Sequence, residues 1–460
     1  MGICVIMLIR GENFMENPVF RRKIYKEILE WKEERSEKYA LLIKGARRVG
    51  KSTIVEEFAK KEFKSYILID FAHTSKEITG LFDDMYNLDF FFLQLQQFTG
   101  VRLYEKESVI IFDEVQLFPR ARQAIKYLVA DGRYKYIETG SLLSIKKNTR
   151  DILIPSEEHK ISMYPMDFEE FLVANNREKF VDLLKDCFDN NKFLGSPLHE
   201  ELLRYYRIYL LTGGMPEAIQ NIVDANLDYV KYDIKILKNI LVSYYKDMRK
   251  HVKNEAEALK IERVYRTLPS QLMNASKKFQ ISNVDENGKM ERYETAIDWL
   301  IGSNMIIKCE CVSLPEIPLK GFVDNETFKF YLSDVGILCT ILGLSVRDIV
   351  TDNISLYKGI IAENFVANQL LCNGFDLFYW KNTATAEVDF LLYTADGVIP
   401  VEVKAGENTQ SKSLKVYMEK YDAKYAIRIS TKDFGYDPKT KIKSVPLYAT
   451  FLIKDNFNEF

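Results

Sequence analysis

The stretch Gly45–Ser52, which reads GARRVGKS, matches the pattern G-x-x-x-x-G-K-[ST] at every fixed position. It follows the apolar run LLIK at 41–44 and opens the helix-like run STIVEEFAKKEF at 52–63. A strand, a glycine-containing turn and a helix are the context in which this pattern forms a phosphate-binding loop. Successive backbone N–H groups and the helix N-terminus then face the anion. The stretch therefore predicts a parallel α/β sheet built around such a loop.

Each fixed position of the loop has a chemical role. Gly45 and Gly50 let the backbone bend and approach the phosphates closely. Lys51 is expected to reach the β- and γ-phosphates of ATP, and the Ser52 hydroxyl to bind Mg²⁺. The two arginines inside the loop could contact phosphate or face solvent, and both possibilities stay open. The expected nucleotide-binding residues are Gly45, Ala46, Arg47, Arg48, Val49, Gly50, Lys51, Ser52 and Thr53.

A second ligand for the metal is expected at the end of another strand. The apolar run VIIF at 109–112 predicts a buried strand, and Asp113 and Glu114 follow it directly. We expect Asp113 in the Mg²⁺ shell and Glu114 as the base that orients and deprotonates the attacking water. A further strand ends at Thr139-Gly140-Ser141, and Ser141 is predicted to touch the γ-phosphate or that water.

Two alternatives to an ATP-hydrolysing site were weighed against these residues. One is a chance match in a glycine turn, and the other is a pseudo-ATPase that binds nucleotide without cleaving it. The intact Lys51, Asp113 and Glu114 disfavour both. An arginine that neutralises transition-state charge is not assigned, because Arg120, Arg122 and Arg150 are equally placed in the sequence.

Length and composition indicate a globular chain of two or three domains. The 460 residues are 47% apolar and 28% charged, with a formal net charge of −2. This charge argues against a uniformly basic nucleic-acid coat but allows a local basic groove. Hydrophobic periodicity predicts four segments: an ATPase core at 16–165, a helical lid at 166–254, a winged-helix-like segment at 255–315 and an α/β domain at 328–460.

The cysteines and the N-terminal apolar run indicate a reducing, aqueous compartment. Six cysteines lie at positions 4, 187, 309, 311, 339 and 372 without any C-x-x-C pair, which predicts free thiols and no structural zinc. Cys309 and Cys311 are expected as a core pair on one strand face. The apolar run at 3–9 is too short to span a bilayer, and no targeting signal is recognisable. We therefore expect a cytoplasmic protein without a membrane partner.

A second group of charged residues lies far downstream. Glu363 is on an amphipathic helix, Asp389 is inside the apolar strand EVDFLL, and Glu402 and Lys404 share one face of the strand VEVK. Such carboxylates can hold divalent ions while the lysine orients a nucleophilic water, as in metal-assisted phosphodiester hydrolysis. The alternative is a buried salt-bridge cluster that supports the fold. The sequence leaves both possibilities open.

The segment between the helices and this domain resembles a helix-turn-helix with a wing. A helix break is expected at 268–272, a second helix at 293–303 and the wing strand at 305–312. Such modules contact DNA or serve as protein-binding lids. Residues 227–269 hold ten Lys or Arg against six Asp or Glu. This bias is compatible with phosphate contact and equally with a solvated helix face.

Several blocks follow the loop in a fixed order: VIIFDEVQ, ETGSLL, YPMDFEEFL, LTGGMPEAI, FYLSDVGIL and VEVKAG. With them, the chain from Asn17 to Phe451 resembles prokaryotic AAA-type ATPases fused to a C-terminal domain of unknown function that is similar to PD-(D/E)XK nucleases. The resemblance implies ATP and Mg²⁺ as ligands, a winged-helix segment and a restriction-endonuclease-like C-terminal fold. It implies nuclease positions at Glu363, Asp389, Glu402 and Lys404.

Three functions are compatible with these features. The first is an ATP-driven switch on a macromolecular partner, with DNA as one candidate. The second is an ATP-regulated, metal-dependent nuclease, and the third is a non-catalytic ATP-gated scaffold or signalling switch. A homo-oligomer is compatible with each of them. A protein kinase is disfavoured, because kinase signatures are absent and the Asp-Glu strand end suits water as the nucleophile.

Overall fold

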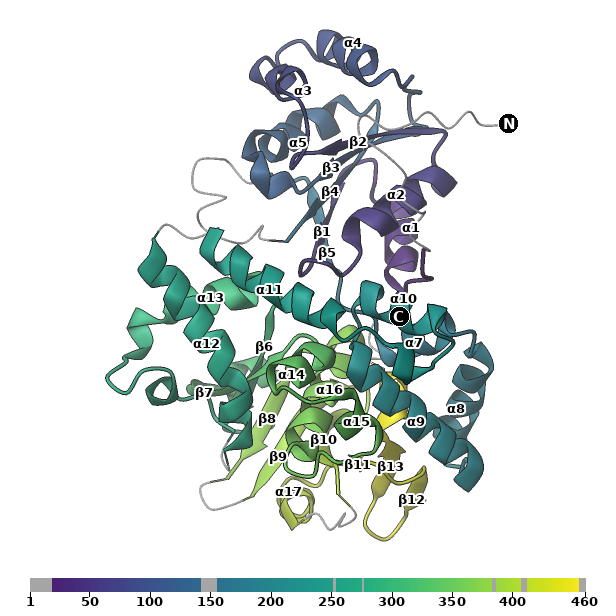
Figure 1. Ribbon diagram of the computed structural model, residues 1–460, viewed down its shortest axis with the longest axis vertical. Coiled ribbons are helices and arrows are strands. Elements are labelled where there is room, and N and C mark those ends of the chain that lie inside the picture. Colours follow the sequence, from purple (N-terminus) through teal and green to yellow (C-terminus); the bar gives the residue numbers. More distant parts are fainter. Residues whose placement is uncertain are drawn as a thin grey trace. The chain divides into compact units, whose positions relative to one another are not determined.

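The computed structural model describes residues 19–141, 155–250, 254–274, 277–382, 386–406 and 412–454. The apolar run at 3–9 and Arg150 lie outside these ranges. The chain divides into two compact units. The first runs to Tyr164 and includes Gly302–Asn304, and the second comprises Pro165–Ile301 and the chain from Met305 onward. Figure 1 labels the elements of both units, which are described separately below.

The first unit is built on a five-stranded sheet in the order β2-β3-β4-β1-β5. All its strand pairs are parallel, as the sequence predicted. The short edge strand β5 was not recognised in the sequence, because its charged residues hide the periodicity. The strands are β1 Ala40–Lys44, β2 Ser65–Asp70, β3 Ser108–Asp113, β4 Lys135–Gly140 and β5 Glu158–Ser162.

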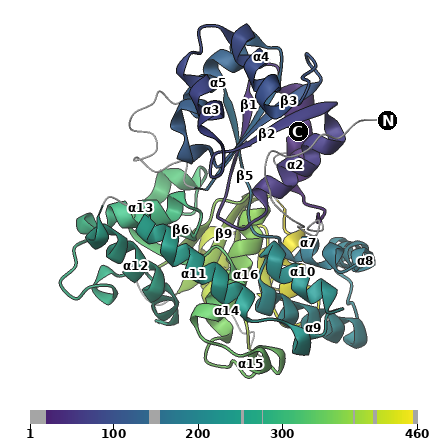
Figure 2. The same cartoon turned by 45° about the horizontal axis from the view of Figure 1, so that its top comes forward.

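Helices cover both faces of this sheet, each with its own apolar core (Figure 2). On one face Trp31 of α1 and Phe58 of α2 pack against β1 and β3. On the other face Phe82 packs with Leu95 of α4 and Ile125 of α5. The helices are α1 Ile24–Glu34, α2 Lys51–Glu62, α3 Lys76–Gly80, α4 Leu88–Thr99 and α5 Pro119–Asp131, with 3-10 turns at Leu81–Asp83 and Val115–Leu117.

The second unit begins with a helical region, as the periodicity predicted. The glycine-containing turn at 212–216 separates two of its helices, α9 and α10. The helices are α7 Phe168–Ala174, α8 Glu178–Asn190, α9 Ser196–Thr212, α10 Pro216–Asp224, α11 Lys235–Lys250, α12 Glu255–Met273 and α13 Glu294–Gly302. Short 3-10 turns lie at Tyr229–Lys231, Ile281–Asn283 and Met290–Arg292.

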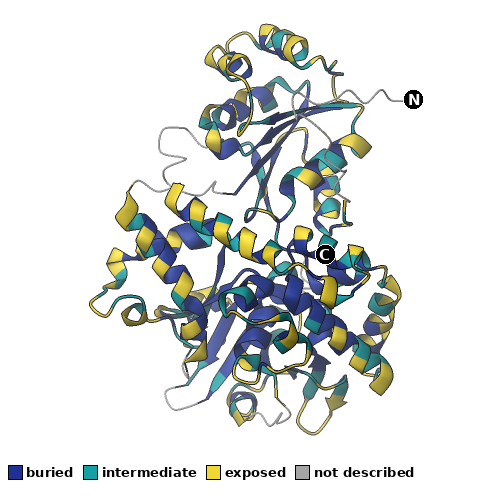
Figure 3. Cartoon of the chain, in the orientation of Figure 1, coloured by how far each residue is buried: buried dark blue, intermediate teal, exposed yellow. Residues whose placement is uncertain are grey.

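The same unit contains a mixed eight-stranded sheet in the order β12-β13-β11-β10-β9-β8-β6-β7, buried over most of its area (Figure 3). Its strands are β6 Ile306–Val312, β7 Val323–Leu332, β8 Phe378–Lys381, β9 Glu387–Thr394, β10 Gly397–Lys404, β11 Ala426–Ser430, β12 Gly435–Asp437 and β13 Ile442–Pro446. Its helices are α14 Val335–Ile341, α15 Val346–Val350, α16 Lys358–Cys372 and α17 Lys412–Tyr421, and 3-10 turns lie at Leu319–Phe322 and Leu447–Leu452. A mixed α/β domain is therefore present, and the finer division of this unit into lid, winged helix and nuclease-like parts stays a prediction.

One expectation for the winged-helix segment is wrong. The break expected at 268–272 is absent, because α12 continues through Pro269 to Met273. Leu268, Pro269 and Leu272 are all buried, so packing outweighs the lost proline hydrogen bond. The strand expected at 305–312 is present as β6, which pairs with β7 and β8 inside the large sheet, and its role as a wing stays a prediction. Cys309 and Cys311 on β6 are buried free thiols, as a core pair requires.

Three of the sequence blocks meet in the interior of the second unit. The Asp334 carboxylate accepts a hydrogen bond from Gly214 N at 2.7 Å, and Met166 N donates to Gly214 O at 2.7 Å. Gly213 has φ 55°, and a Cβ there would lie 2.1 Å from Asp334 Oδ1. Burial raises the pKa of Asp334 to about 6, against the backbone hydrogen bonds it accepts. The blocks YPMDFEEFL, LTGGMPEAI and FYLSDVGIL thus form a packing junction.

Candidate nucleotide site and C-terminal carboxylate cluster

The loop from β1 to α2 has the backbone that a phosphate cradle requires. Gly50 lies in the left-handed region at φ 95°, and Arg48 is also left-handed at φ 67°. A Cβ on Gly45 would lie 2.3 Å from the carbonyl oxygen of Met163, so only glycine fits there. Both fixed glycines are therefore explained by local geometry.

Lys51 is folded back over this loop. Its Nζ donates to the carbonyl oxygens of Gly45 at 3.0 Å and Ala46 at 2.9 Å, and the residue is only 5% exposed. Burial lowers the pKa of the Lys51 ammonium to about 8, although Glu114 and Asp113 act in the opposite direction. Its hydrogen-bond partners are neutral carbonyls, so its positive charge remains available to an anion.

Ser52, Asp113 and Thr139 form a compact oxygen cluster at the strand ends. Ser52 Oγ donates to Asp113 Oδ1 at 2.9 Å, and Thr139 Oγ1 donates to the same oxygen. Burial raises the pKa of Asp113, whereas these two hydroxyl hydrogen bonds lower it. A hydroxyl beside a carboxylate is a ligand pair that suits Mg²⁺, so Ser52 and Asp113 fit the expected metal. The hydroxyl that reaches Asp113 is that of Thr139 and not that of Ser141.

Glu114 is held by a neighbour that the sequence did not single out. Its backbone is left-handed at φ 54°, and its N–H donates to Thr139 Oγ1 at 3.4 Å. The amide nitrogen of Gln116 donates to Glu114 Oε2. Gln116 is buried, and its Oε1 has no hydrogen-bond partner in the described part of the chain. The backbone strain and the amide contact together fix where the Glu114 carboxylate points.

The arginines of the loop and of α5 differ in their exposure and in the carboxylates that they contact. Arg122 is buried and bound through two nitrogens to Glu158, at 2.6 and 2.9 Å. In this conformation the ion pair with Glu158 holds Arg122, so Arg122 cannot be the arginine that neutralises transition-state charge. Arg120 is exposed and pairs with Asp83. Within the loop, Arg48 is exposed and Arg47 is half-buried.

The four residues of the predicted nuclease site belong to α16, β9 and β10 in the second unit. Lys404 Nζ contacts Glu402 Oε1 at 2.5 Å, while Glu402 Oε2 is buried without a hydrogen-bond partner among the described residues. Asp389 Oδ2 accepts a hydrogen bond from Val403 N at 2.9 Å. Burial raises the pKa of Glu402, and its Lys404 contact lowers it.

Two further lysines neutralise this C-terminal carboxylate cluster. Lys277 Nζ pairs with Glu363 and lies 3.5 Å from Asp389 Oδ1. Lys329, fully buried on β7, lies 3.3 Å from Glu363 Oε1. Burial alone would raise the pKa of Glu363, but Lys277 and Lys329 hold it at about 2. Ammonium groups thus take the carboxylate contacts that a divalent ion would need, and the cluster does not fit a metal as it stands. Across the described ranges, no three His, Cys, Asp or Glu side chains are grouped to hold a metal ion.

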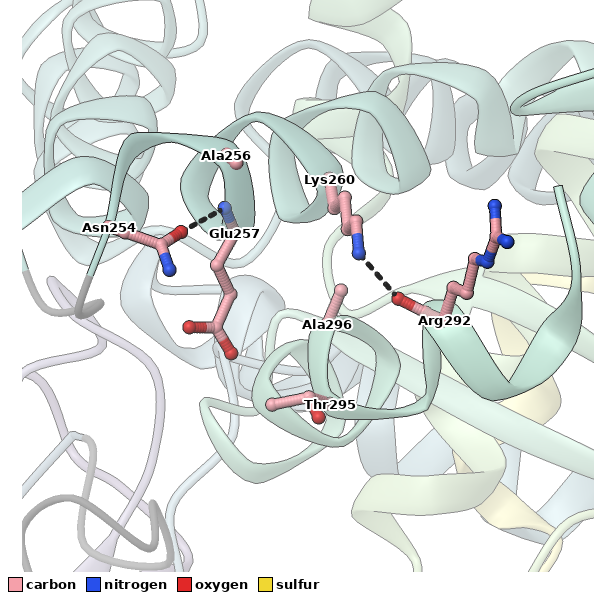
Figure 4. Close-up of a pocket in the computed structure, with 7 residues that line it drawn as sticks. All are labelled: Asn254, Ala256, Glu257, Lys260, Arg292, Thr295 and Ala296. Atoms are coloured by element: carbon pink, nitrogen blue, oxygen red, sulfur yellow. Dashed lines mark hydrogen bonds between the residues drawn. The ribbon is translucent and has the colours of Figure 1, made fainter.

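A separate pocket of about 220 Å³ lies where α12 begins and α13 passes (Figure 4). Lys260 Nζ donates to the carbonyl oxygen of Arg292 at 3.0 Å, and Asn254 caps α12 by accepting from Glu257 N at 2.8 Å. The seven residues around it are mostly polar: Asn254, Ala256, Glu257, Lys260, Arg292, Thr295 and Ala296.

Comparison with known families divides the chain into three matched regions. Residues 37–172 match an AAA domain family, residues 203–348 match one domain of unknown function, and residues 358–449 match another. An uncharacterized protein of Methanocaldococcus jannaschii, MJ1637, is 25% identical over 257 residues, which are 53% of this chain and 51% of the relative. The chain thus spans about half the length of this curated relative. None of these matches assigns the second unit a nuclease activity.

Several solved structures share parts of the architecture at low similarity. A Walker-type ATPase of Pyrococcus abyssi is 16% identical with a TM-score of 0.42, covering 71% of this chain and 96% of its own. Cdc6p of Pyrobaculum aerophilum is 12% identical with a TM-score of 0.26, covering 72% and 93%. Orc1 of Aeropyrum pernix, solved with DNA, is 12% identical with a TM-score of 0.26, covering 73% and 94%. These scores are too low to support an inference about function. Within the described ranges, no helix is long and apolar enough to cross a membrane.

Proposed function

Starting from the AAA-type P-loop ATPase domain at residues 37–172, we propose that this chain binds ATP with Mg²⁺, hydrolyses it and uses the cycle as a switch on a macromolecular partner. The observation that carries the proposal is the state of Lys51: a buried ammonium whose hydrogen-bond partners among the described residues are neutral loop carbonyls. Phosphate oxygens are the anions that such a cradle of N–H groups and one lysine binds.

The roles of the remaining residues follow from their contacts. Lys51 would exchange its two carbonyl contacts for phosphate oxygens, and Ser52 and Asp113 would hold Mg²⁺, which supplies charge neutralisation when bound. Glu114 would take the proton of the attacking water. We infer that Gln116 keeps the Glu114 carboxylate in position and that Thr139 orients Asp113.

The test compares two lysines on the same helix. Lys51→Ala is expected to abolish binding of a fluorescent ATP analogue with Mg²⁺, a loss of roughly 100-fold or more in affinity given the strength of charge-assisted contacts. The control is Lys61→Ala, because Lys61 is 60% exposed and pairs with Glu57 on the surface of α2. Equal affinity of the Lys51→Ala protein and the control would refute the proposed site.

The nuclease alternative has one observation in its favour. Asp389, Glu402 and Lys404 share one region of the sheet, and one oxygen of Glu402 is buried without a partner among the described residues. Plasmid cleavage with Mg²⁺ or Mn²⁺, comparing the wild type with Glu402→Ala and Lys404→Ala, tests it. Absence of cleavage with either metal removes this alternative. The scaffold alternative predicts tight nucleotide binding with very slow turnover that duplex DNA does not change.

A further inference from the structure

Helix α11 presents positive charge on its outer side. Lys235, Lys238, Lys246, Arg249 and Lys250 are all exposed. The only acidic residue in the helix, Asp247, is buried at 4% exposure. The outer side of α11 therefore carries cations without an exposed carboxylate from its own sequence. Figure 3 shows exposed positions recurring along the whole helix.

The inner side of α11 is already occupied by the fold. Leu237, Ile240, Tyr244 and Met248 are buried. Helix α12 supplies one of the contacts, because Arg249 Nη2 on α11 lies 3.0 Å from Glu262 Oε2 on α12. Val242 of α11 is 49% exposed, but a single exposed valine among cations is not the exposed apolar face that insertion into a lipid surface requires.

Helix α12 extends the positive surface, and two arginines cover its Glu262, while Glu255 in its first turn is exposed. Glu262 is bound by Arg249 on one oxygen and by Arg266 at 2.9 Å on the other, and its side chain is 10% exposed. The Arg266 guanidinium also lies 4.0 Å from the ring centre of Tyr245. Two exposed arginines thus share one buried carboxylate, and a net positive charge remains at the surface. Lys260 and Arg292, at the pocket of Figure 4, lie beyond Glu262 toward the start of α12.

We propose that this α11 cationic face, defined as Lys235, Lys238, Lys246, Arg249, Lys250 and Arg266, binds the phosphate backbone of duplex DNA. The inference rests on the proposed function, for which it names the macromolecular partner. Fifteen residue steps from Lys235 to Lys250 span roughly 22 Å, which matches about six base pairs of a duplex. Lysine contacts to phosphate position a protein without reading bases, so binding is independent of sequence.

The duplex is favoured over single strands because no aromatic ring among the described residues of α11 and α12 is exposed as a stacking platform. Proteins that bind single strands stack bases on exposed rings. The ring beside this face, Tyr245, is half-buried and already covered by Arg266. Lysines carried on a packed helix instead place positive charge at intervals along the regular phosphate backbone of a duplex.

The test is fluorescence anisotropy with a labelled 20-base-pair DNA duplex and the full chain, from 50 to 200 mM salt. We expect an affinity that falls steeply with salt, with a logarithmic slope of about −4 to −5 for about five phosphate contacts. Lys238→Glu/Lys246→Glu should weaken binding roughly tenfold or more and make the slope shallower. Lys238→Arg/Lys246→Arg should restore it, because charge and not lysine itself is required.

The matched control is Lys179→Glu/Lys185→Glu, which makes the same charge change at two exposed positions of α8. It should leave DNA affinity within about twofold of wild type, because its charges lie outside the face. Binding of an ATP analogue is measured in every variant and should be unchanged, so loss of the nucleotide site is distinguished from loss of the DNA surface.

Three outcomes overturn the proposal. The first is equal DNA affinity of the Lys238→Glu/Lys246→Glu protein and the control. The second is tighter binding of wild type to duplex RNA, or to vesicles rich in phosphatidylserine, than to duplex DNA. The third is no DNA binding by a protein that still binds ATP.

Discussion

The nucleotide site of the first unit and the C-terminal carboxylate cluster of the second contain the same residue types in opposite states. At the nucleotide site, Lys51 contacts backbone carbonyls, and Asp113 contacts hydroxyls. In the cluster, Lys277 contacts Glu363 and Asp389, and Lys404 contacts Glu402. The first arrangement keeps ionic charge available to a ligand, and the second cancels it internally.

The comparison shows that the charged residues of a motif indicate a ligand-binding site when no opposite charge of the protein already pairs with them. Buried ions are costly unless they are paired or bind a ligand, so an ammonium that contacts only neutral groups indicates a ligand. The cluster pairs its carboxylates with lysines, and one oxygen of Glu402 is buried without a hydrogen-bond partner among the described residues. The predictions below would break or sharpen this contrast.

The largest expected effect is on turnover at the nucleotide site. Glu114→Gln should reduce ATP hydrolysis by roughly 10²–10⁴-fold, because it removes the proton acceptor for the attacking water. Affinity for the ATP analogue should change little, because the substitution leaves the loop residues and Lys51 in place. Phosphate-release assays at saturating ATP measure the effect, and turnover at the wild-type rate would show that Glu114 is not the base.

In the cluster, Lys277→Ala should destabilise the second unit by about 3 kcal/mol, because it leaves a buried carboxylate with one cation fewer. The surface pair Lys415–Glu419 provides the control, since its side chains are 77% and 66% exposed. Lys415→Ala should cost about 0–1 kcal/mol. Urea-unfolding midpoints measure both. A higher midpoint of Lys277→Ala on adding Mn²⁺, with no such rise in wild type, would show that Lys277 takes the place of a metal.

A smaller effect is expected at the residue that positions the base. Gln116→Leu should lower kcat roughly tenfold while KM for ATP stays near wild type, because a misplaced carboxylate slows the chemistry without altering the loop. Gln97→Leu, at an exposed position of α4, is the control. Should KM rise and kcat stay constant, Gln116 would have a binding role instead.

The smallest effect concerns pH. Burial lowers the pKa of Lys51 to about 8 in the free protein, and a bound phosphate would raise it again. The ammonium form binds, so affinity should be constant well below pH 8 and should fall as the pH rises through 8, about twofold at pH 8 and about tenfold at pH 9. Calorimetry in two buffers at pH 8.5 should show proton uptake on binding. Proton release would contradict this assignment.

The local geometry of the candidate nucleotide site could be predicted because its main residues lie in two contiguous stretches, and their roles stay a proposal. Gly45–Ser52 and the strand before Asp113 each carry a local signature, and a parallel sheet brings their ends to one edge. Gln116 was missed because an amide two residues after the base has no pattern of its own. The sequence indicated Thr139 only as one of three residues at a strand end, because its contact with Asp113 depends on the register between two strands.

For the C-terminal carboxylate cluster, the sequence indicated the carboxylates but not all of the lysines that pair with them. Its sequence pattern covers the carboxylates and Lys404, but its charge balance depends on Lys277 and Lys329, which lie 86 and 34 residues before Glu363. Periodicity carries no information about such pairs. The helix break at Pro269 was wrong for a related reason, because burial of its neighbours overrides local propensity.

The packing junction of the second unit has a consequence for the order of synthesis. Gly214 reaches its hydrogen-bond partner Asp334 across 120 residues, and Phe168 reaches Gln369 across 201. During translation, helices α7–α10 emerge from the ribosome before these partners have been made. Every strand of the first unit, by contrast, is available once residue 162 has left the exit tunnel. The ATPase domain can therefore fold while the rest of the chain is still being translated, and the second unit, which closes much longer loops, finishes late.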